Sequence, residues 1–174
     1  MSGNNESVAK KAMDTEMLKL DEYEQSLGLP EHSIPNGMPD EIKKYLGMNR
    51  DELEKLNPED CVNTAYIIGQ FVFFLQREQN RESSREIWAK SEMDKLIAGK
   101  IESYSQYTKT EHKIANIARE NSVVADYNSI YHKAQRRKAR LEYIAASLKS
   151  LADTLKDIYR AKINNLRNER SENA

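Results

Sequence analysis

The sequence predicts an all-α protein in which a long antiparallel, coiled-coil-like helical hairpin follows an N-terminal helix, a Pro-rich linker and short helices. The 4 prolines all lie at or before Pro58, and only Gly69 and Gly99 follow it among the glycines. Helix breakers are therefore confined to the first third of the chain. With 39% hydrophobic and 32% charged residues and a mean hydropathy of −0.83, the core must be thin. The seam between paired helices satisfies that requirement.

Residues 1–26 predict an acidic amphipathic helix, running from about Glu6 to Ser26 and ended by Gly28. Residues 27–56 predict a linker that contains short helices, because three prolines and Gly37 lie between 29 and 39.

Two short helices are expected within that linker region. Asp40 is placed to cap the first, and Gly47 to close it. The next has the pattern of a capping box in the run from Asn49 to Glu52.

The hairpin is expected to occupy residues 57–168. Its first helix begins with Asn57 as cap and Pro58 at the first helical position, and runs to about Tyr107. The Thr108–Glu111 run fits the S/T-x-x-E capping box, so we expect the second helix there, continuing to about Asn168. Residues 169–174 are expected to form a disordered tail.

The polarity pattern predicts how the two helices pair. Apolar residues of the second helix alternate in steps of 3 and 4; they are Leu141, Ile144, Leu148, Leu151, Leu155 and Ile158. An earlier seam (Ile114, Ile117, Val124) has a register that does not continue into this one. Folding about residue 108 places position n opposite about 216 − n, so that polar 76–86 faces polar 130–140 and Leu75 meets Leu141.

Charge is distributed unevenly, although the formal net charge is only −1. Residues 1–60 carry 7 basic and 14 acidic side chains, 61–132 carry 9 of each, and 133–174 carry 11 basic and 5 acidic. Such asymmetry indicates an anionic partner or head-to-tail self-association. Ordinary solvation of a long helical protein explains it equally well.

Several classes of function are disfavoured. The longest apolar-looking run, 66–75, has 10 residues and contains Gln70, against roughly 20 for a membrane span. Cys61 is the single cysteine, and no apolar signal region opens the chain, which favours a reducing, intracellular location. The three histidines show no metal-ligand spacing, and no phosphate loop or nucleophile motif is present. We therefore expect no catalytic residues, no metal and no cofactor.

Two basic sets stand out. Arg77, Arg81 and Arg85 repeat at i, i+4, i+8, each followed by a glutamate, which favours a self-neutralised, solvated helix face over a binding face. The second set is denser, with five cations within eight residues: Lys133, Arg136, Arg137, Lys138 and Arg140. With nearby tyrosines (Tyr127, Tyr131, Tyr143), these cations favour contact with phosphates about as strongly as structural pairing with Glu78 and Glu82. The tyrosines fit seam positions better than stacking platforms.

The stretch from Asn63 to about Asn165 resembles the UvsY family of recombination mediators of T4-type phages. The matching features are a Tyr-rich apolar entry at Ala65–Ile68, a polar helix through Trp88, the run Lys100–Tyr104, and a final helix closing in Leu155–Lys162. The family's basic motif reads Lys-Ala-Arg-Leu-Asp-Tyr-Tyr. Here the run is 98–104, with one cation at Lys100, Ala98 at the other cation position, Ser103 in place of a tyrosine, and Lys95 one turn earlier.

This resemblance implies a helical homo-oligomer that binds single-stranded DNA weakly and helps a RecA-like recombinase replace a single-strand-binding protein. The expected DNA contacts are the five cations of 133–140, placed by charge density alone, together with Lys95, Lys100 and Tyr104, placed by the resemblance. The alternative is a phage structural or assembly protein, of the virion or a scaffold, acting through protein–protein contacts.

Overall fold

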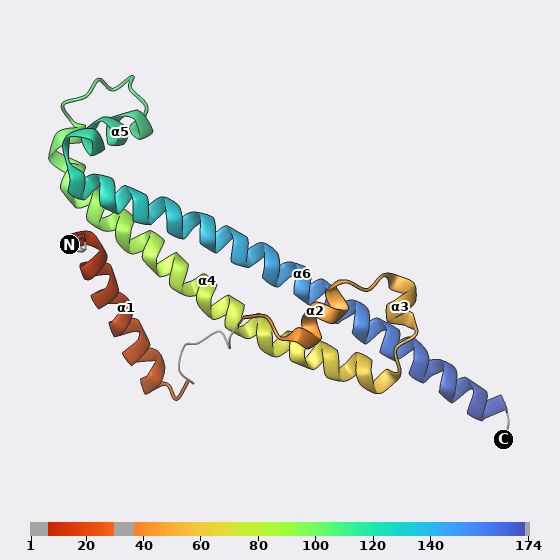
Figure 1. Cartoon of the computed structure of the whole chain (residues 1–174). Coiled ribbons are helices and arrows are strands. Elements are labelled where there is room, and N and C mark those ends of the chain that lie inside the picture. Colours follow the sequence, from red (N-terminus) through yellow and green to blue (C-terminus); the bar gives the residue numbers. More distant parts are fainter. Residues whose placement is uncertain (1–6, 30–36, 173–174) are drawn as a thin grey trace, which may run out of the picture. The chain divides into compact units, whose positions relative to one another are not determined.

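The computed structural model describes residues 7–29 and 37–172, and the regular secondary structure of these residues is entirely helical. The helices are α1 (Val8–Ser26), α2 (Asp40–Leu46), α3 (Arg50–Glu54), α4 (Pro58–Ile101), α5 (Thr110–Glu120) and α6 (Ser122–Glu172) (Figure 1). The prediction of an all-α fold with two long antiparallel helices, α4 and α6, is confirmed.

The chain divides by its contacts into two compact units. The first unit comprises residues 1–31 and 78–140, and the second comprises 32–77 and 141–174. Each unit therefore joins an N-terminal segment to one length of the α4–α6 pair.

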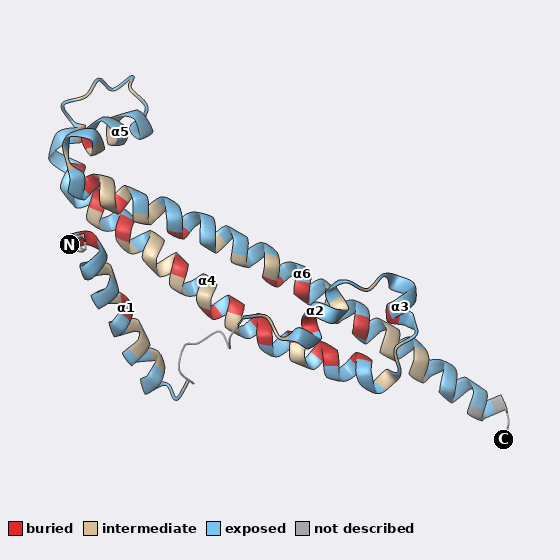
Figure 2. Cartoon of the chain, viewed as in Figure 1, coloured by how far each residue is buried: buried red, intermediate tan, exposed pale blue. Residues whose placement is uncertain are grey.

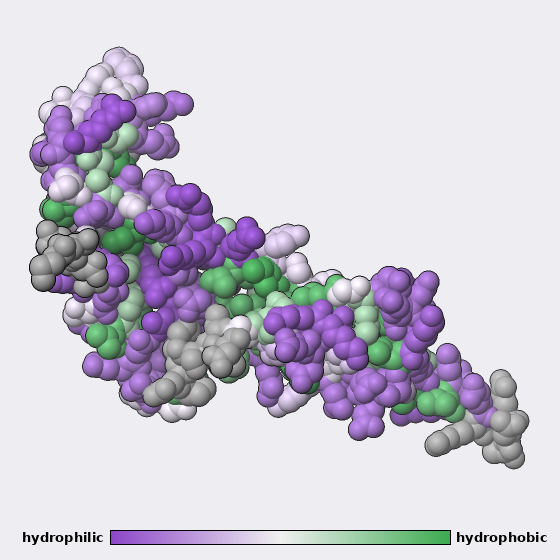
Figure 3. All heavy atoms as spheres, in the orientation of Figure 1, coloured by the Kyte–Doolittle hydropathy of each residue, from purple (hydrophilic) through white to green (hydrophobic). Residues whose placement is uncertain are grey.

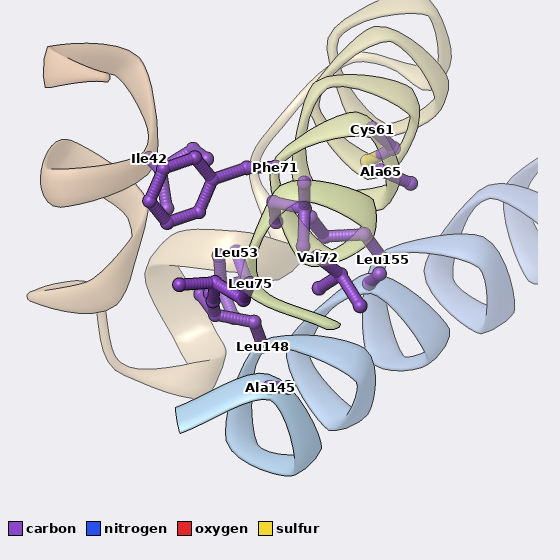
Figure 4. Packing of buried hydrophobic residues seen from close by; sticks show 12 residues of the cluster. Ile42, Leu53, Cys61, Ala65, Phe71, Val72, Leu75, Ala145, Leu148 and Leu155 are labelled. Carbon is purple, nitrogen blue, oxygen red and sulfur yellow. The ribbon is translucent and has the colours of Figure 1, made fainter. Parts of the chain in front are cut away.

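The core of the second unit lies between the α4–α6 seam and the two short helices. Fully buried Ile68 of α4 and Leu148 and Leu155 of α6 belong to one cluster. Ile42 of α2 and Leu53 of α3 cover it from the side (Figure 4). Leu75 and Leu141 lie in this cluster, as the 216 − n register predicts. Burial of each large side chain contributes about 1.5–3 kcal/mol, so this seam is what holds the second unit together.

The core of the first unit is built by four helices. Ala9 of α1, Ile97 of α4, Ile117 of α5 and Val124 of α6 are buried in one cluster. Trp88 and Tyr127 pack edge to face at its margin, with ring centroids 5.5 Å apart. Figure 2 shows buried positions as short red segments among exposed and intermediate ones along the helices. The core is thin, as the composition predicts.

Three predicted helix signals are present. Gly28 ends α1 with φ +74°, and Gly28 N and Leu29 N donate to the carbonyls of Gln25 and Glu24, the two bonds of a Schellman motif. Asn49 and Glu52 form both bonds of a capping box on α3, at 3.0 and 2.7 Å. Asn57 Oδ1 accepts from Asp60 N at 2.7 Å and caps α4.

Gly47 follows the last residue of α2, as predicted, but several other boundaries differ from the prediction. Asp40 is the first residue of α2, not its cap, and its carboxylate accepts from Lys43 instead. The helix α4 ends at Ile101, six residues before Tyr107. Just beyond this point, Ser103 Oγ and Ser103 N both donate to the carbonyl oxygen of Lys100, and these bonds replace the regular hydrogen bonds of the helix. Thr108 caps nothing: α5 begins at Thr110, and its cap position, Lys109, makes no side-chain capping bond.

The second long helix is also interrupted, where the sequence predicts continuity from 109 to 168. Asn121 has an extended backbone, and its Oδ1 accepts from Val123 N and Val124 N at 3.0 and 3.4 Å. Asparagine is a preferred N-cap residue. Asn121 therefore ends α5 with its extended backbone and caps the start of α6 with its side chain. At its other end α6 continues to Glu172, so residues 169–172 of the predicted disordered tail are helical. Residues 173–174 of that tail, and the predicted start of the first helix at Glu6, lie outside the described residues.

Candidate nucleic-acid interface

The basic row predicted at 133–140 lies on α6 within the first unit. Lys133, Arg136 and Arg140 are exposed, and in the described part of the chain none of them forms an ion pair with a carboxylate. Their i, i+3, i+7 spacing places them on one face of α6. Arg136 Nε donates to the carbonyl oxygen of His132 at 3.2 Å, which leaves its other guanidinium donors exposed. These three cations form the open part of the row.

Arg137 and Lys138 are structurally engaged. Lys138 Nζ donates to Glu86 of α4 at 2.6 Å, and Arg137 Nη1 lies 3.6 Å from Glu82. The sequence predicts Glu82 opposite this row, and that pairing is confirmed for Arg137. The partnership of Lys138 with Glu86 lies further along α4 than the 216 − n rule places it. Two of the five predicted cations therefore join α6 to α4.

The arginine stripe of α4 is paired as predicted, but it is not solvated. Arg85 lies 2.6 Å from Glu82 and 3.3 Å from Glu78, and their side chains are only 19%, 3% and 23% exposed. Arg81, 12% exposed, contacts Asp21 of α1. Burial lowers the pKa of Arg81, and the nearby charge of Arg85 lowers it further. The charge of Glu82 acts in the opposite direction. Packing of α1 and α6 over this face of α4 turns a surface pattern into an interior charge network.

The network leaves both donors and an acceptor without hydrogen-bond partners in the described part of the chain. Arg81 Nε and Arg85 Nε are buried without a hydrogen-bond partner among the described residues, as is Glu82 Oε2. The third arginine of the stripe, Arg77, belongs to the second unit and lies over the Phe73 ring at 5.9 Å. Buried charges demand partners, so this face is fixed in place and is not a free binding surface.

The cations placed by the family resemblance are more dispersed. Lys95 is exposed but donates to Glu92 at 2.6 Å. Lys100 is exposed at the last turn of α4, where a cation also complements the helix dipole. Tyr104 is half-buried and packs against the core of the first unit, so its ring is poorly placed to stack on a base.

The three tyrosines near the row differ in role. Tyr127 is 8% exposed and packs on Trp88, so its expected seam role is confirmed; burial, followed by the nearby Glu92, raises its pKa. Tyr131 is half-buried with its ring edge-on to His132 at 5.0 Å. Tyr143 is 75% exposed.

The first unit also contains a cavity of about 300 Å³ that the sequence pattern does not predict. It lies where α1 meets α4 and α6, and Ser7 Oγ closes one side by donating to Asp126 at 2.6 Å. Its lining residues are Ser7, Lys10, Met13, Glu82, Arg85, Asp126, Ser129, Ile130, Lys133, Ala134 and Arg137. Local sequence pattern carries no signal for it, because it depends on where α1 docks.

Among the described residues, no group of three His, Cys, Asp or Glu side chains is arranged to hold a metal ion. None of the described helices is long and apolar enough to cross a membrane. Comparison of the chain with protein-family models, with curated proteins and with solved structures finds no match.

Proposed function

We propose that this protein is a non-enzymatic, single-stranded-DNA-binding homo-oligomer of the recombination-mediator type, which helps to load a RecA-like recombinase in place of a single-strand-binding protein in the host cytoplasm. The observation that carries the DNA-binding part is the open cationic row on α6, Lys133, Arg136 and Arg140, which lacks carboxylate partners in the described part of the chain. Cations that are not internally neutralised are those that release counterions when they meet phosphates.

The size of the row fits weak binding. Three open cations support a salt slope of about 2, at roughly 0.7 per phosphate contact on a single strand. A count of five cations from the sequence overstates the salt slope, because Arg137 and Lys138 are already paired with Glu82 and Glu86. A mediator must give its strand up to a recombinase, and a shallow salt slope suits that transfer. The recombinase itself enters only through the resemblance at residues 63–165.

Self-association is supported by an apolar face of α4 in the second unit. Val62, Tyr66 and Phe73 are 41%, 66% and 45% exposed, and their i, i+4, i+11 spacing aligns them along the helix around Gly69. A Cβ built on Gly69 meets nothing within 4 Å, so this face is open. On the face of the molecule drawn in Figure 3, hydrophobic side chains gather in patches between hydrophilic ones. Exposed apolar faces of this kind indicate association.

The alternative is a structural or assembly protein of a phage virion or scaffold. The pairing of Arg81, Arg85, Arg137 and Lys138 with carboxylates of the same chain favours it, because these cations act within the chain. Under this alternative the open row meets acidic protein surfaces.

The deciding experiment is a salt titration of binding to labelled oligo-dT, followed by fluorescence anisotropy. The double variant Arg136→Ala/Arg140→Ala removes two open cations, and we expect the slope of log K against log salt to fall by about 1.4, at 0.7 per contact. The matched control is Lys156→Ala/Arg160→Ala, which removes the same charge from α6 where each cation pairs with Asp153 or Asp157. The control slope should fall clearly less.

Absence of oligo-dT binding at low salt would overturn the proposal and favour the assembly protein. An equal fall in both double variants would show that total charge, and not the open row, governs binding.

A further inference from the structure

No contact within the described residues explains why position 69 is a glycine. Gly69 lies in the interior of α4, where glycine is less favourable than alanine because it loses more conformational freedom on folding. Its φ is not positive, and a Cβ built on it meets nothing within 4 Å. Neither a turn nor tight packing inside the described part of the chain therefore requires it. Close approach of another backbone is a use of helical glycine that remains.

The surroundings of Gly69 form a low centre between two aromatic rings. Two hollows of about 520 and 400 Å³ adjoin there, and Ala65 and Gly69 line both of them. Tyr66 lines the larger hollow and Phe73 the smaller one, and both rings are exposed. Gln70 Nε2 donates to Tyr66 Oη at 2.8 Å, so the polar end of this ring has a partner even where water is excluded.

This face of α4 is complementary to a second copy of itself. Tyr66 lies three residues before Gly69, and Phe73 lies four residues after it. An antiparallel copy that crosses at Gly69 therefore brings each Tyr66 to the level of the other copy's Phe73, as the two-fold symmetry of an isologous interface requires. The paired glycines let the two backbones approach, and aromatic rings at one level pack favourably edge to face.

The charges along α4 favour the antiparallel direction. Residues 61–76 carry no charged side chain, and the stretch is flanked by Glu59 and Asp60 at one end and by Arg77 at the other. Glu59 and Arg77 are separated by five turns of about 3.6 residues, so they lie on one face of the helix. Their midpoint is next to Gly69, so an antiparallel copy brings each Glu59 to the level of an Arg77. A parallel copy would place carboxylates opposite carboxylates, which is unfavourable.

We propose that two copies of this chain associate through the exposed apolar face of α4, as an antiparallel pair of α4 helices that cross at Gly69. This inference rests on the self-association in the proposed function and deepens it, because it names the surface, the direction and the residue that permits the contact. The interface residues belong to the second unit, and the open cationic row belongs to the first. The pairing therefore uses none of the three open cations.

Substitution of Gly69 in the full chain tests the inference, with association measured by sedimentation equilibrium. Gly69→Leu places a bulky side chain at the crossing, and it should raise the dissociation constant of the pair at least about tenfold. The matched control is Gly99→Leu, at an exposed glycine of the same helix in the first unit, where a Cβ likewise meets nothing within 4 Å. The control should associate as the parent protein does.

Single cysteines on the face report the direction of the pair. Gln70→Cys lies beside the two-fold axis of the antiparallel pair, so mild oxidation should join two copies through a disulfide. Val62→Cys lies seven residues from Gly69, which separates its two copies by about 20 Å along the helices at 1.5 Å per residue, so it should stay unlinked. Cys61 is buried and gives no competing link. These two variants also cover the case in which Gly69→Leu fails to fold.

Two results would overturn the inference while the homo-oligomer itself stands. One is association of Gly69→Leu that is equal to that of the parent protein or of Gly99→Leu. The other is oxidation that links Val62→Cys and leaves Gln70→Cys unlinked. If the parent protein is a monomer at micromolar concentration, the inference and the proposed self-association both fail. The oligo-dT titration decides the DNA-binding part separately.

Discussion

The charge network between α4, α1 and α6 predicts a large loss in the free energy of unfolding for the Glu82→Ala variant. The Glu82 side chain is 3% exposed and serves Arg85 at 2.6 Å and Arg137 at 3.6 Å. Removing one partner of a buried pair costs about 3–5 kcal/mol, because the remaining charge is left without compensation. Arg85 keeps Glu78 at 3.3 Å. We therefore expect the low end, a loss of about 3 kcal/mol in the free energy of unfolding.

Urea denaturation followed by circular dichroism, at one fixed protein concentration, measures this loss. The control is Asp157→Ala, whose partner Arg160 and own side chain are 71% and 72% exposed. An exposed pair is worth at most about 1 kcal/mol, so the control should change little. The reasoning is refuted if Glu82→Ala costs no more than Asp157→Ala. In the cycle of Glu82→Ala with Arg85→Ala, a coupling energy of about 0.5–3 kcal/mol should appear.

Three further outcomes are expected. Asn57→Ala should lower the free energy of unfolding by about 1 kcal/mol, because it removes the cap of α4. The control Asn63→Ala, at an exposed position inside α4, should cause no such loss. Equal effects of the two variants in a urea titration would contradict the capping role of Asn57. Cys61 is fully buried, and burial raises the pKa of its thiol. A thiol reagent should therefore label Cys61 only after the protein unfolds. Rapid labelling of Cys61 in the folded protein would show that the second unit is open. Light scattering should give a mass well above the 20.1 kDa of one chain, and a clean monomer at micromolar concentration would disprove self-association through the Val62, Tyr66 and Phe73 face.

The helical pair was predictable because its signals are local and repeated. The heptad seam from Leu141 to Ile158, the breaker-free stretch after Pro58 and the Asn57 cap each specify helix, and matching polar layers specify the register. The break at Asn121 left no trace in the seam, because Ile117 and Val124 on either side of it belong to the same earlier seam. Periodicity alone does not say which residue ends a helix, and a capping side chain does.

The site was less predictable because it depends on contacts between distant segments. Arg81 carries the sequence pattern of a solvated cation, and only the docking of α1 through Asp21 and Ala9 buries it. The same docking encloses the cavity beside Ser7 and Asp126. The basic row at 133–140 was found from charge density, yet which of its members stay open was settled by Glu82 and Glu86 on α4.

Photo-cross-linking of a strand carrying 4-thiothymidine, with the attached peptides identified by mass spectrometry, tests the central claim most directly. The reactive base reports the residues that touch DNA, independently of affinity. We predict cross-links on α6 around the open row, Lys133 to Arg140. Cross-links confined to the Lys95–Tyr104 segment, or no cross-link under conditions in which the strand is bound, would contradict the account.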